Sequence, residues 1–199
     1  MRMKKTKKRT RTSILRIQPF LLTDVDAVKK FTDHQIGLGY YSIEELITNQ
    51  KKSVSFSGLI SSFLLVDEKD GSVKGLRLAY PPNNWKHGKG SELRSDLWPF
   101  AISDTAYFQS LFLSKDVQGQ GFGPKLSKMS IDVFRKLGAK GIATHSWKES
   151  PHNSSVKYLE SVGFKKIIEH PKYWAEVDYT CPRDGKPCQC TAIEMYLTL

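Results

Sequence analysis

The fold class that the sequence predicts is α+β, in one domain. The chain has 199 residues, 39% of them hydrophobic and 26% charged, which is typical of a single soluble globular domain. Strand-like apolar runs and helix-like amphipathic segments follow the order strand, two helices, two or three strands, helix, strand, helix and final strands. The clearest unit, Tyr107 to Gly138, joins a strand to a helix through a glycine-rich turn. The sequence has no internal repeat and no linker-like break, so residues 13–199 are expected to form one domain.

The chain is expected to begin with a strand at Ile14 to Leu22, where apolar residues are frequent. A helix over Val25 to Phe31 follows, with Thr23 or Asp24 at its N-cap. Ser42-Ile43-Glu44-Glu45 has the spacing of a capping box and therefore predicts the start of a second, short helix.

Two strands, Phe63 to Val66 and Val73 to Ala79, are expected to pair as a hairpin. Asp70-Gly71 between them is typical of a tight turn. Pro81 to Ser95 is then a polar, glycine-rich connection that is longer than most loops of a compact domain. Its length favours a functional segment.

The stretch Tyr107 to Gly138 predicts an anion-binding turn. Tyr107 to Leu113 has the composition of a buried strand, and Gln118 to Gly123 carries three glycines that let the backbone pass close to a ligand. Pro124 suits the first turn of a helix, and Gly138 suits its end. The apolar residues of this helix share one face: Phe122, Leu126, Met129, Val133 and Leu137. Free N–H groups and the positive end of the helix dipole would face the turn and favour an anion.

The last third is expected to contain one helix, at Ser155 to Val162, and several strands. The strands are predicted at Gly141 to Ser146, Phe164 to Glu169, Tyr173 to Tyr179 and Ala192 to Leu199.

The net charge of +11 is concentrated at the N-terminus. Residues 1–12 contain seven Lys and Arg residues and no acid, so the rest of the chain carries +4. Such a run is typical of a solvated, disordered tail, and contact with nucleic acid through it stays open. The apolar run after the tail is interrupted by Arg16, Gln18 and Pro19, unlike a signal peptide, and no segment reaches the roughly 18 apolar residues of a membrane span. We therefore expect a cytoplasmic protein with no membrane partner.

Taken together, these residues resemble the GNAT superfamily of acetyl-coenzyme A-dependent N-acetyltransferases. Gln118-Gly119-Gln120-Gly121-Phe122-Gly123 fits the family's Gln/Arg-x-x-Gly-x-Gly/Ala pyrophosphate loop, and Leu111 to Asp116 fits the strand and polar turn before it. Ser155 to Phe164 resembles the helix and Gly-Phe segment of many members. The resemblance is strong over residues 104–168 and extends by element order to Ile14. It implies a GNAT-type central, mixed, mostly antiparallel sheet of six or seven strands, about four flanking helices, and a splayed strand pair at the coenzyme site.

Two other nucleotide-binding loops do not fit the glycine pattern. A Rossmann loop needs Gly-x-Gly-x-x-Gly, whereas Gly119, Gly121 and Gly123 alternate. The segment Pro124-Lys125-Leu126 lacks the Gly-Lys-Ser/Thr of a P-loop. A purely structural glycine turn stays open.

The resemblance implies that acetyl-coenzyme A is the cosubstrate. Backbone N–H groups of Val117 to Gly123 would hold its pyrophosphate, and the strand at Leu111 to Leu113 would pair with pantetheine and polarise the acetyl carbonyl. The residues expected at the coenzyme are Leu111, Phe112, Leu113, Val117, Gln118, Gly119, Gln120, Gly121, Phe122, Gly123, Lys125, Asn153 and Ser155. The candidates for the adenosine phosphate are Lys125, Lys128 and Lys157.

The resemblance leaves the catalytic acid and base open. Many members have a tyrosine four residues before the glycine of Gly-Phe, and that position is Leu159 here, with Tyr158 beside it. Tyr158 is therefore a candidate acid and equally a candidate core residue. Asp104 and Tyr107, near the start of the fourth strand, are candidates for catalysis. Further candidate bases are Gln109, Glu92, His145 and His152.

The predicted function is transfer of an acetyl group from acetyl-coenzyme A to an amine, of a small molecule or a protein, by direct attack in a ternary complex. The alternative is a non-catalytic coenzyme A-binding or nucleic acid-associated module with the same fold. Transfer of another acyl group, or to a hydroxyl, stays open, as does the oligomeric state, a homodimer included. The aromatic residues that would suit a flat or cationic acceptor are Tyr40, Tyr41, Trp85, Trp98, Tyr173 and Trp174.

Cys181, Cys188 and Cys190 lie close together near the C-terminus and do not suggest a disulfide framework. Their Cys-x6-Cys-x-Cys spacing is not a common structural zinc pattern, so no bound metal is expected, although zinc binding with His170 stays open. Reduced cysteines in a hairpin turn are the simpler interpretation. A disulfide between Cys181 and Cys188 under oxidising conditions also stays open.

Overall fold

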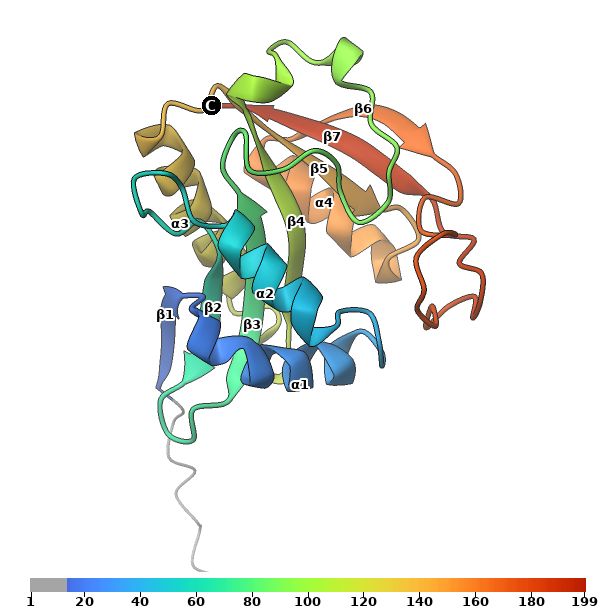
Figure 1. Ribbon diagram of the computed structural model, residues 1–199. Coiled ribbons are helices and arrows are strands. Elements are labelled where there is room, and N and C mark those ends of the chain that lie inside the picture. Colours follow the sequence, from blue (N-terminus) through green and yellow to red (C-terminus); the bar gives the residue numbers. More distant parts are fainter. Residues whose placement is uncertain (1–13) are drawn as a thin grey trace, which may run out of the picture.

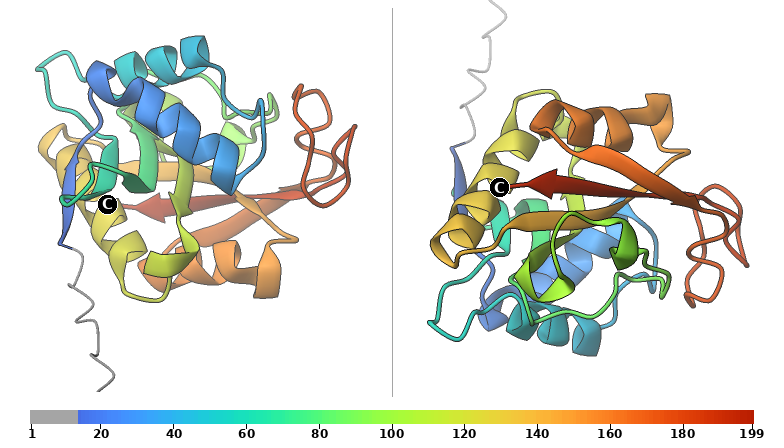
Figure 2. Two further views of the ribbon diagram at one scale, coloured as in Figure 1. Left: turned by 90° about the horizontal axis from the view of Figure 1, so that it is seen from below. Right: turned by 90° about the horizontal axis from the view of Figure 1, so that it is seen from above.

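The structure is a computed structural model that describes residues 14–199, and these form a seven-stranded sheet between two layers of helices (Figures 1 and 2). The strands are β1 (Leu15–Pro19), β2 (Phe63–Asp67), β3 (Val73–Tyr80), β4 (Thr105–Leu113), β5 (Gly141–Trp147), β6 (Lys165–His170) and β7 (Ala192–Thr198). The helices are α1 (Val25–Gln35), α2 (Ile43–Lys52), α3 (Phe122–Lys136) and α4 (Ser154–Val162). The predicted α+β class is confirmed. The basic tail, residues 1–12, lies outside the described residues.

The sheet is mixed and forks near its centre. Its order is β1-β2-β3-β4-β5-β7-β6, and β4–β5 is the parallel pair while the other neighbours are antiparallel. β4 and β5 pair from Thr105 with Gly141 to Phe108 with Thr144. Beyond these residues β4 stays paired with β3 and β5 with β7, so the two strands separate. This is the splayed strand pair that the resemblance implied.

A bulge on β4 lies at the point where the strands separate. Leu78 of β3 pairs with Ser110 and Ala79 pairs with Phe108, so Gln109 has no partner on β3. A bulge of this kind bends the strand and increases its local twist, which helps β4 to diverge from β5.

The helices cover opposite faces of the sheet. Figure 2 shows α1 and α2 on one face, together with the segment 81–104, and α3 and α4 on the other. α3 connects β4 to the parallel strand β5, as a crossover helix must, and it buries Leu126, Ile131 and Phe134 against the sheet. Within residues 14–199, no helix has the length and apolar character needed to cross a membrane.

Several local predictions are confirmed. Ser42 and Glu45 form a reciprocal capping box at the start of α2, in which Ser42 Oγ accepts the Glu45 N–H at 3.1 Å and the Glu45 carboxylate accepts the Ser42 N–H at 2.9 Å. The hairpin of β2 and β3 turns at Gly71, whose φ is 71°. The first helix, however, continues to Gln35, beyond the predicted end at Phe31.

Two other predictions are wrong. Asp24 stands at the N-cap of α1, but its carboxylate accepts the N–H of Leu21 at 2.8 Å and caps no N–H of α1. The segment Tyr173 to Tyr179 forms turns in place of a strand. Its aromatic side chains are buried anchors of the long β6–β7 loop, packed with Tyr40 and the cysteines. Aromatic residues are frequent in strands because strands bury them, and here a loop buries them equally well.

Candidate active site

The turn before α3 forms an open cradle of backbone N–H groups. Gly119 and Gly121 have φ values of 74° and 78°, and a Cβ added at either would meet no atom within 4 Å. Within the described chain, the N–H groups of residues 118–123 donate to no protein acceptor. The side chains of Gln118 and Gln120 hold the turn in place, because they donate to the carbonyls of Leu113 at 2.9 Å and Asp116 at 2.7 Å. This cradle fits a diphosphate, which such N–H groups bind at helix N-termini.

The start of α3 lies directly against β4 and α4. A Cβ on Gly123 would come within 3.4 Å of Leu111 and 3.7 Å of both Leu113 and Tyr158. Glycine at this position therefore lets the positive end of the helix dipole approach the fork. The Lys125 ammonium lies 5.2 Å above the Phe122 ring in the same exposed first turn.

The other two lysine candidates for the adenosine phosphate lie further along their helices. Lys128 pairs with Asp132 at 2.6 Å, and Lys157 is exposed on α4.

The α4 side of the fork offers unsatisfied polar groups. Asn153, at the N-cap of α4, has a φ of 56° and a buried Oδ1 with no hydrogen-bond partner among the described residues. Ser155 Oγ lies 2.8 Å from Ser146 Oγ of β5, and this hydrogen bond connects α4 to the strand. A buried amide without a partner is unfavourable, so a ligand that bonded Asn153 would satisfy it. Both residues fit the contact with the coenzyme that the family resemblance implies.

Tyr158 belongs to a buried polar cluster beneath α3. Its hydroxyl lies 2.5 Å from Ser127 Oγ and 3.2 Å from the Gly123 carbonyl. Arg77, only 2% exposed, donates to Ser127 at 2.7 Å and lies 3.5 Å from the Tyr158 hydroxyl, with its guanidinium 4.1 Å above the Phe108 ring. Burial lowers the pKa of Arg77, and no described carboxylate forms an ion pair with it. The Tyr158 hydroxyl thus joins α3 to α4.

The opposite face of the fork carries a tyrosine–histidine pair. Tyr107 OH lies 2.7 Å from His145 Nδ1. The two residues flank the last bridge between β4 and β5, since Tyr107 precedes Phe108 and His145 follows Thr144. Gly88 of the 81–104 segment covers the pair, because a Cβ there would lie 2.1 Å from the Tyr107 oxygen.

Glu194 of β7 links this pair to a second histidine. Its Oε2 lies 2.7 Å from His170 Nε2 and 3.5 Å from His145 Nε2, and its Oε1 accepts the Trp98 indole N–H at 2.6 Å. His170 Nδ1 in turn lies 3.0 Å from the Glu92 carboxylate, whose side chain is 63% exposed. A row of titratable groups therefore runs from Tyr107 to the surface.

The protonation states of this row follow from burial and hydrogen bonding. Burial raises the pKa of Tyr107 well above its ordinary value and lowers the pKa of His145 below 6.5. Burial alone would raise the pKa of Glu194, but the His145 ring 3.5 Å away and the hydrogen bonds from His170 and Trp98 outweigh burial and lower the pKa to about 2. At neutral pH a neutral His145 can therefore accept a proton from Tyr107 while facing an ionised carboxylate.

The remaining sequence candidates lie elsewhere. Asp104 is at the start of β4, the closed end of the fork, where its carboxylate pairs with Lys140 at 3.0 Å. His152 is exposed next to α4. The sequence did not predict Glu194 as the partner of His145, His170 and Trp98. The available signal was a single carboxylate within the otherwise apolar run Ala192 to Leu197.

A cation of the protein itself lies beside two of the aromatic residues named for the acceptor. The Lys89 ammonium is 2.6 Å from a Glu45 carboxylate oxygen, 5.0 Å from the Tyr40 ring centre and 4.5 Å from the Tyr41 ring centre. Tyr41 OH lies 2.8 Å from Ser110 Oγ, directly after the bulge of β4. The six aromatic residues named for the acceptor are all buried, so they contribute to the core as well.

By sequence, the chain matches no protein-family model and no curated protein. By structure, it is similar to the ribosomal-protein-S18-alanine N-acetyltransferase of Escherichia coli, with 18% identity, a TM-score of 0.64, and coverage of 93% of this chain and 94% of that one. It is also similar to the NatC complex bound to Gag peptide and CoA, with 16% identity, a TM-score of 0.65, and coverage of 93% and 98%. A third similar structure is a GCN5-related N-acetyltransferase from Kribbella flavida, with 19% identity, a TM-score of 0.58, and coverage of 93% and 98%. These likenesses confirm the predicted fold.

Proposed function

Because the chain has the fold of the GNAT N-acetyltransferases, we propose that it transfers an acetyl group from acetyl-coenzyme A to an amine by direct attack within a ternary complex. The observation that carries the proposal is the fork between β4 and β5, where an anion cradle on one face meets the Tyr107–His145 pair on the other. On this proposal the donor would bind, and the proton would be accepted, at one opening in the sheet.

The chain's own groups would hold the donor. The N–H groups of residues 118–123 would bind the diphosphate, and Asn153 and Ser155 would contact the pantetheine arm. Beyond Phe108, the edge of β4 that faces β5 is unpaired, so its N–H groups are free to pair with the arm and to polarise a carbonyl. The coenzyme supplies the thioester carbon that the amine attacks.

The row from Tyr107 to Glu92 would accept the proton of the attacking amine. Tyr107 would take this proton on its oxygen while its own hydroxyl proton passes to His145 Nδ1. Glu194 would stabilise the resulting imidazolium from 3.5 Å, and His170 and Glu92 lead on to solvent. As the new C–N bond forms and the C–S bond breaks, the thiolate takes up a proton. Gly88 covers Tyr107, so the acceptor reaches it after this part of the 81–104 segment moves.

The environment of Lys89 supports an alkylamine as the acceptor. Its ammonium group lies against two tyrosine rings and one carboxylate, the combination that binds organic cations. An acceptor amine that displaced Lys89 would contact the same two rings and the same carboxylate. Tyr41 among them bonds Ser110 of β4, which places the amine near the fork. We propose that Tyr40, Tyr41 and Glu45 bind this amine before it loses its proton.

Calorimetry with acetyl-coenzyme A tests the donor site. Gly121→Asp brings a carboxylate into the cradle and should abolish measurable binding. Gly138→Asp is the matched control, because Gly138 has a φ of 75° and open space like Gly121 but lies at the opposite end of α3. The variants share the backbone strain and differ in distance from the cradle. Equal affinity of both variants for acetyl-coenzyme A would overturn the donor site.

An assay of coenzyme A thiol release, carried out with a panel of alkylamines as acceptors, tests the reaction itself. Acetylation of at least one amine, with one thiol released per amide formed, is the expected result. Tight binding of acetyl-coenzyme A without thiol release across the panel would instead support the non-catalytic alternative.

A further inference from the structure

The loop between β6 and β7 brings three thiols and one carboxylate to a single point. Cys181, Cys188 and Cys190 are 3%, 1% and 1% exposed. Cys181 Sγ lies 3.8 Å from Cys190 Sγ, and Asp184 Oδ2 lies 3.1 Å from Cys190 Sγ and 3.9 Å from Cys181 Sγ. One ligand atom from each of the four residues lies within 4.8 Å of the others.

These distances match a tetrahedral zinc site. Zn–S bonds of about 2.3 Å and Zn–O bonds of about 2.0 Å place two sulfurs about 3.8 Å apart and a sulfur and an oxygen about 3.5 Å apart. The distance between the Cys181 and Cys190 sulfurs has the first value, and their distances to Asp184 Oδ2, 3.9 and 3.1 Å, lie on either side of the second. The Cys188 sulfur lies within 4.8 Å of these three atoms. Four donors with no open position are typical of structural zinc.

Hydrogen-bond donors lie beside three of the four groups, as they do beside metal-bound thiolates. Tyr179 OH donates to Cys188 Sγ at 3.3 Å. Such donors stabilise a thiolate and orient it toward a metal.

The other two of these groups, Asp184 and Cys190, have donors as well. The backbone N–H of Gln189 donates to Asp184 Oδ2 at 3.2 Å. The Arg183 guanidinium lies 3.6 Å from the Asp184 carboxylate and 4.0 Å from Cys190 Sγ, where it offsets negative charge.

We propose that Cys181, Asp184, Cys188 and Cys190 bind one Zn²⁺ ion as a closed structural site. The Asp184 carboxylate oxygen lies against two buried sulfurs, and a shared cation would hold these three ligand atoms together. His170, the fourth ligand considered from the sequence, is bound to Glu92 and Glu194 and takes no part. Asp184 takes its place.

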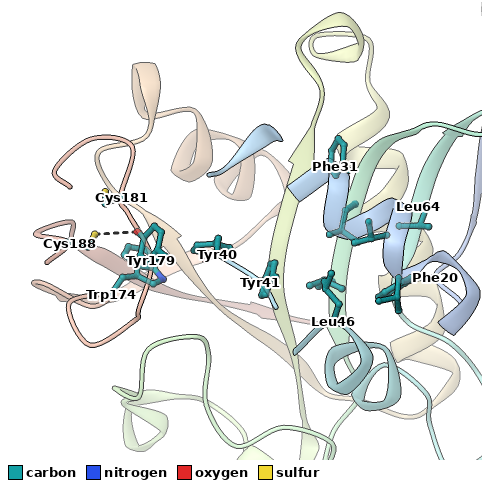
Figure 3. Close-up of a cluster of buried hydrophobic side chains, with 14 of the residues drawn as sticks. Phe20, Phe31, Tyr40, Tyr41, Leu46, Leu64, Trp174, Tyr179, Cys181 and Cys188 are labelled. Carbon is teal, nitrogen blue, oxygen red and sulfur yellow. Dashed lines mark hydrogen bonds between the residues drawn. The ribbon is translucent and has the colours of Figure 1, made fainter. Parts of the chain in front are cut away.

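Zinc at this position would order the loop that borders the acceptor side of the fork. Figure 3 shows the hydrogen bond from Tyr179 to Cys188, with Tyr40 and Tyr41 leading from there toward α1 and α2. The Tyr179 and Tyr40 rings meet edge to face at 4.9 Å, and Tyr40 meets Phe112 of β4 at 6.3 Å. Contacts thus continue from the metal ligands to the strand expected to hold the thioester.

Metal analysis of the full chain, expressed with zinc and purified without chelator, tests the proposal independently of acetyl transfer. About one zinc per chain is expected for a single four-ligand site. Asp184→Asn, Cys188→Ser and Cys190→Ser should each lower the zinc content well below this value. Asp178→Asn is the matched control, because this exposed aspartate of the same loop pairs only with Lys186 and should leave zinc content unchanged.

A second measurement needs no variant and so remains valid if the substituted proteins fail to fold. An organomercurial titrated into the native protein should release zinc in step with loss of the three thiols. A folded protein without zinc, whose three cysteines alkylate freely, would overturn the proposal. A disulfide within the cluster would lower the intact mass of the protein by two hydrogens, and finding it would overturn the proposal as well.

Discussion

Glu194 is a fully buried carboxylate in the middle of β7, and its position explains the chemistry available to His145. Two histidines and the Trp98 indole surround it, so its negative charge is satisfied without a lysine or arginine side chain. A carboxylate held in this way orients a histidine and stabilises the imidazolium that forms on proton uptake. In the proposed reaction Glu194 positions His145, and Tyr107 and His145 carry the proton.

Replacing His145 with Gln should lower kcat by about 100-fold or more, the usual contribution of a general base, with the affinity for acetyl-coenzyme A unchanged. His152→Gln is the matched control, since His152 is exposed beside α4. In the unmodified protein, kcat should fall with decreasing pH only below 6.5, because burial lowers the pKa of His145. Steady-state kinetics as a function of pH measure both effects, and an acid limb above pH 7 would contradict the assignment.

Tyr158→Phe separates packing from catalysis at the residue that the sequence left open between them. The Tyr158 hydroxyl contacts Ser127 and the Gly123 carbonyl. Its removal should lower the free energy of unfolding by about 1 kcal/mol and change kcat no more than a few-fold. Chemical denaturation and kinetics on the same preparation decide the matter, and a loss of kcat comparable to that of His145→Gln would make Tyr158 the acid.

At the scale of elements, predictions succeeded where the determining interactions are local. The capping box of α2, the turn at Gly71 and the glycine cradle before α3 each depend on a few neighbouring residues. The segment Tyr173 to Tyr179 could not be predicted in this way, because its aromatic residues are buried by contacts with distant parts of the chain. The fork itself depends on pairing among β3, β4, β5 and β7, which no local pattern encodes.

The closed end of the fork depends on a glycine. A Cβ at Gly141 would lie 2.0 Å from the Tyr196 hydroxyl oxygen, and that hydroxyl bonds Thr105 Oγ1 at 2.9 Å. Gly141→Ala should therefore force the buried ring aside and lower the free energy of unfolding by about 1–3 kcal/mol, as overpacking does. Lys140→Ala next to it removes an exposed ion pair and should cost under about 1 kcal/mol. Urea denaturation measures the free energy of unfolding of both variants. Equal losses would show that the Tyr196 ring moves aside at little cost.

At the scale of the whole molecule, the candidate site combines residues far apart in the sequence. Tyr107, His145 and Glu194 meet because β4 pairs with β5 and β5 pairs with β7. The cradle was predictable because it is one continuous segment with a family pattern. The row of titratable groups from Tyr107 to Glu92 was not predictable, since its members share no spacing, although Tyr107, His145 and Glu92 were each individual candidates.

The stability of the whole molecule should fall on acidification. The pKa of Glu194 is lowered to about 2 in the folded protein, so its stabilising contribution is present above its ordinary value of 4.5 and is lost as the pH falls toward 2. The lowered pKa of His145 acts in the same direction from pH 6.5 downward, because the unfolded chain takes up that proton more readily. Urea midpoints should therefore decrease from pH 7 to pH 3. Below pH 4.5 the decrease should be shallower in Glu194→Gln, and an equally steep one would contradict the role of Glu194.

Arg77 has a consequence for how ionic strength affects the donor site. At 0.1 M salt, dissolved ions largely screen exposed charges that are more than about 10 Å apart, but they screen a buried charge much less. The Arg77 guanidinium lies beneath the first turns of α3, joined to them through Ser127 and Tyr158, whereas the Lys125 ammonium is in solvent. As the salt concentration rises, the attraction between Lys125 and a diphosphate in the proposed donor site should weaken first. The attraction from the buried Arg77 guanidinium should change less.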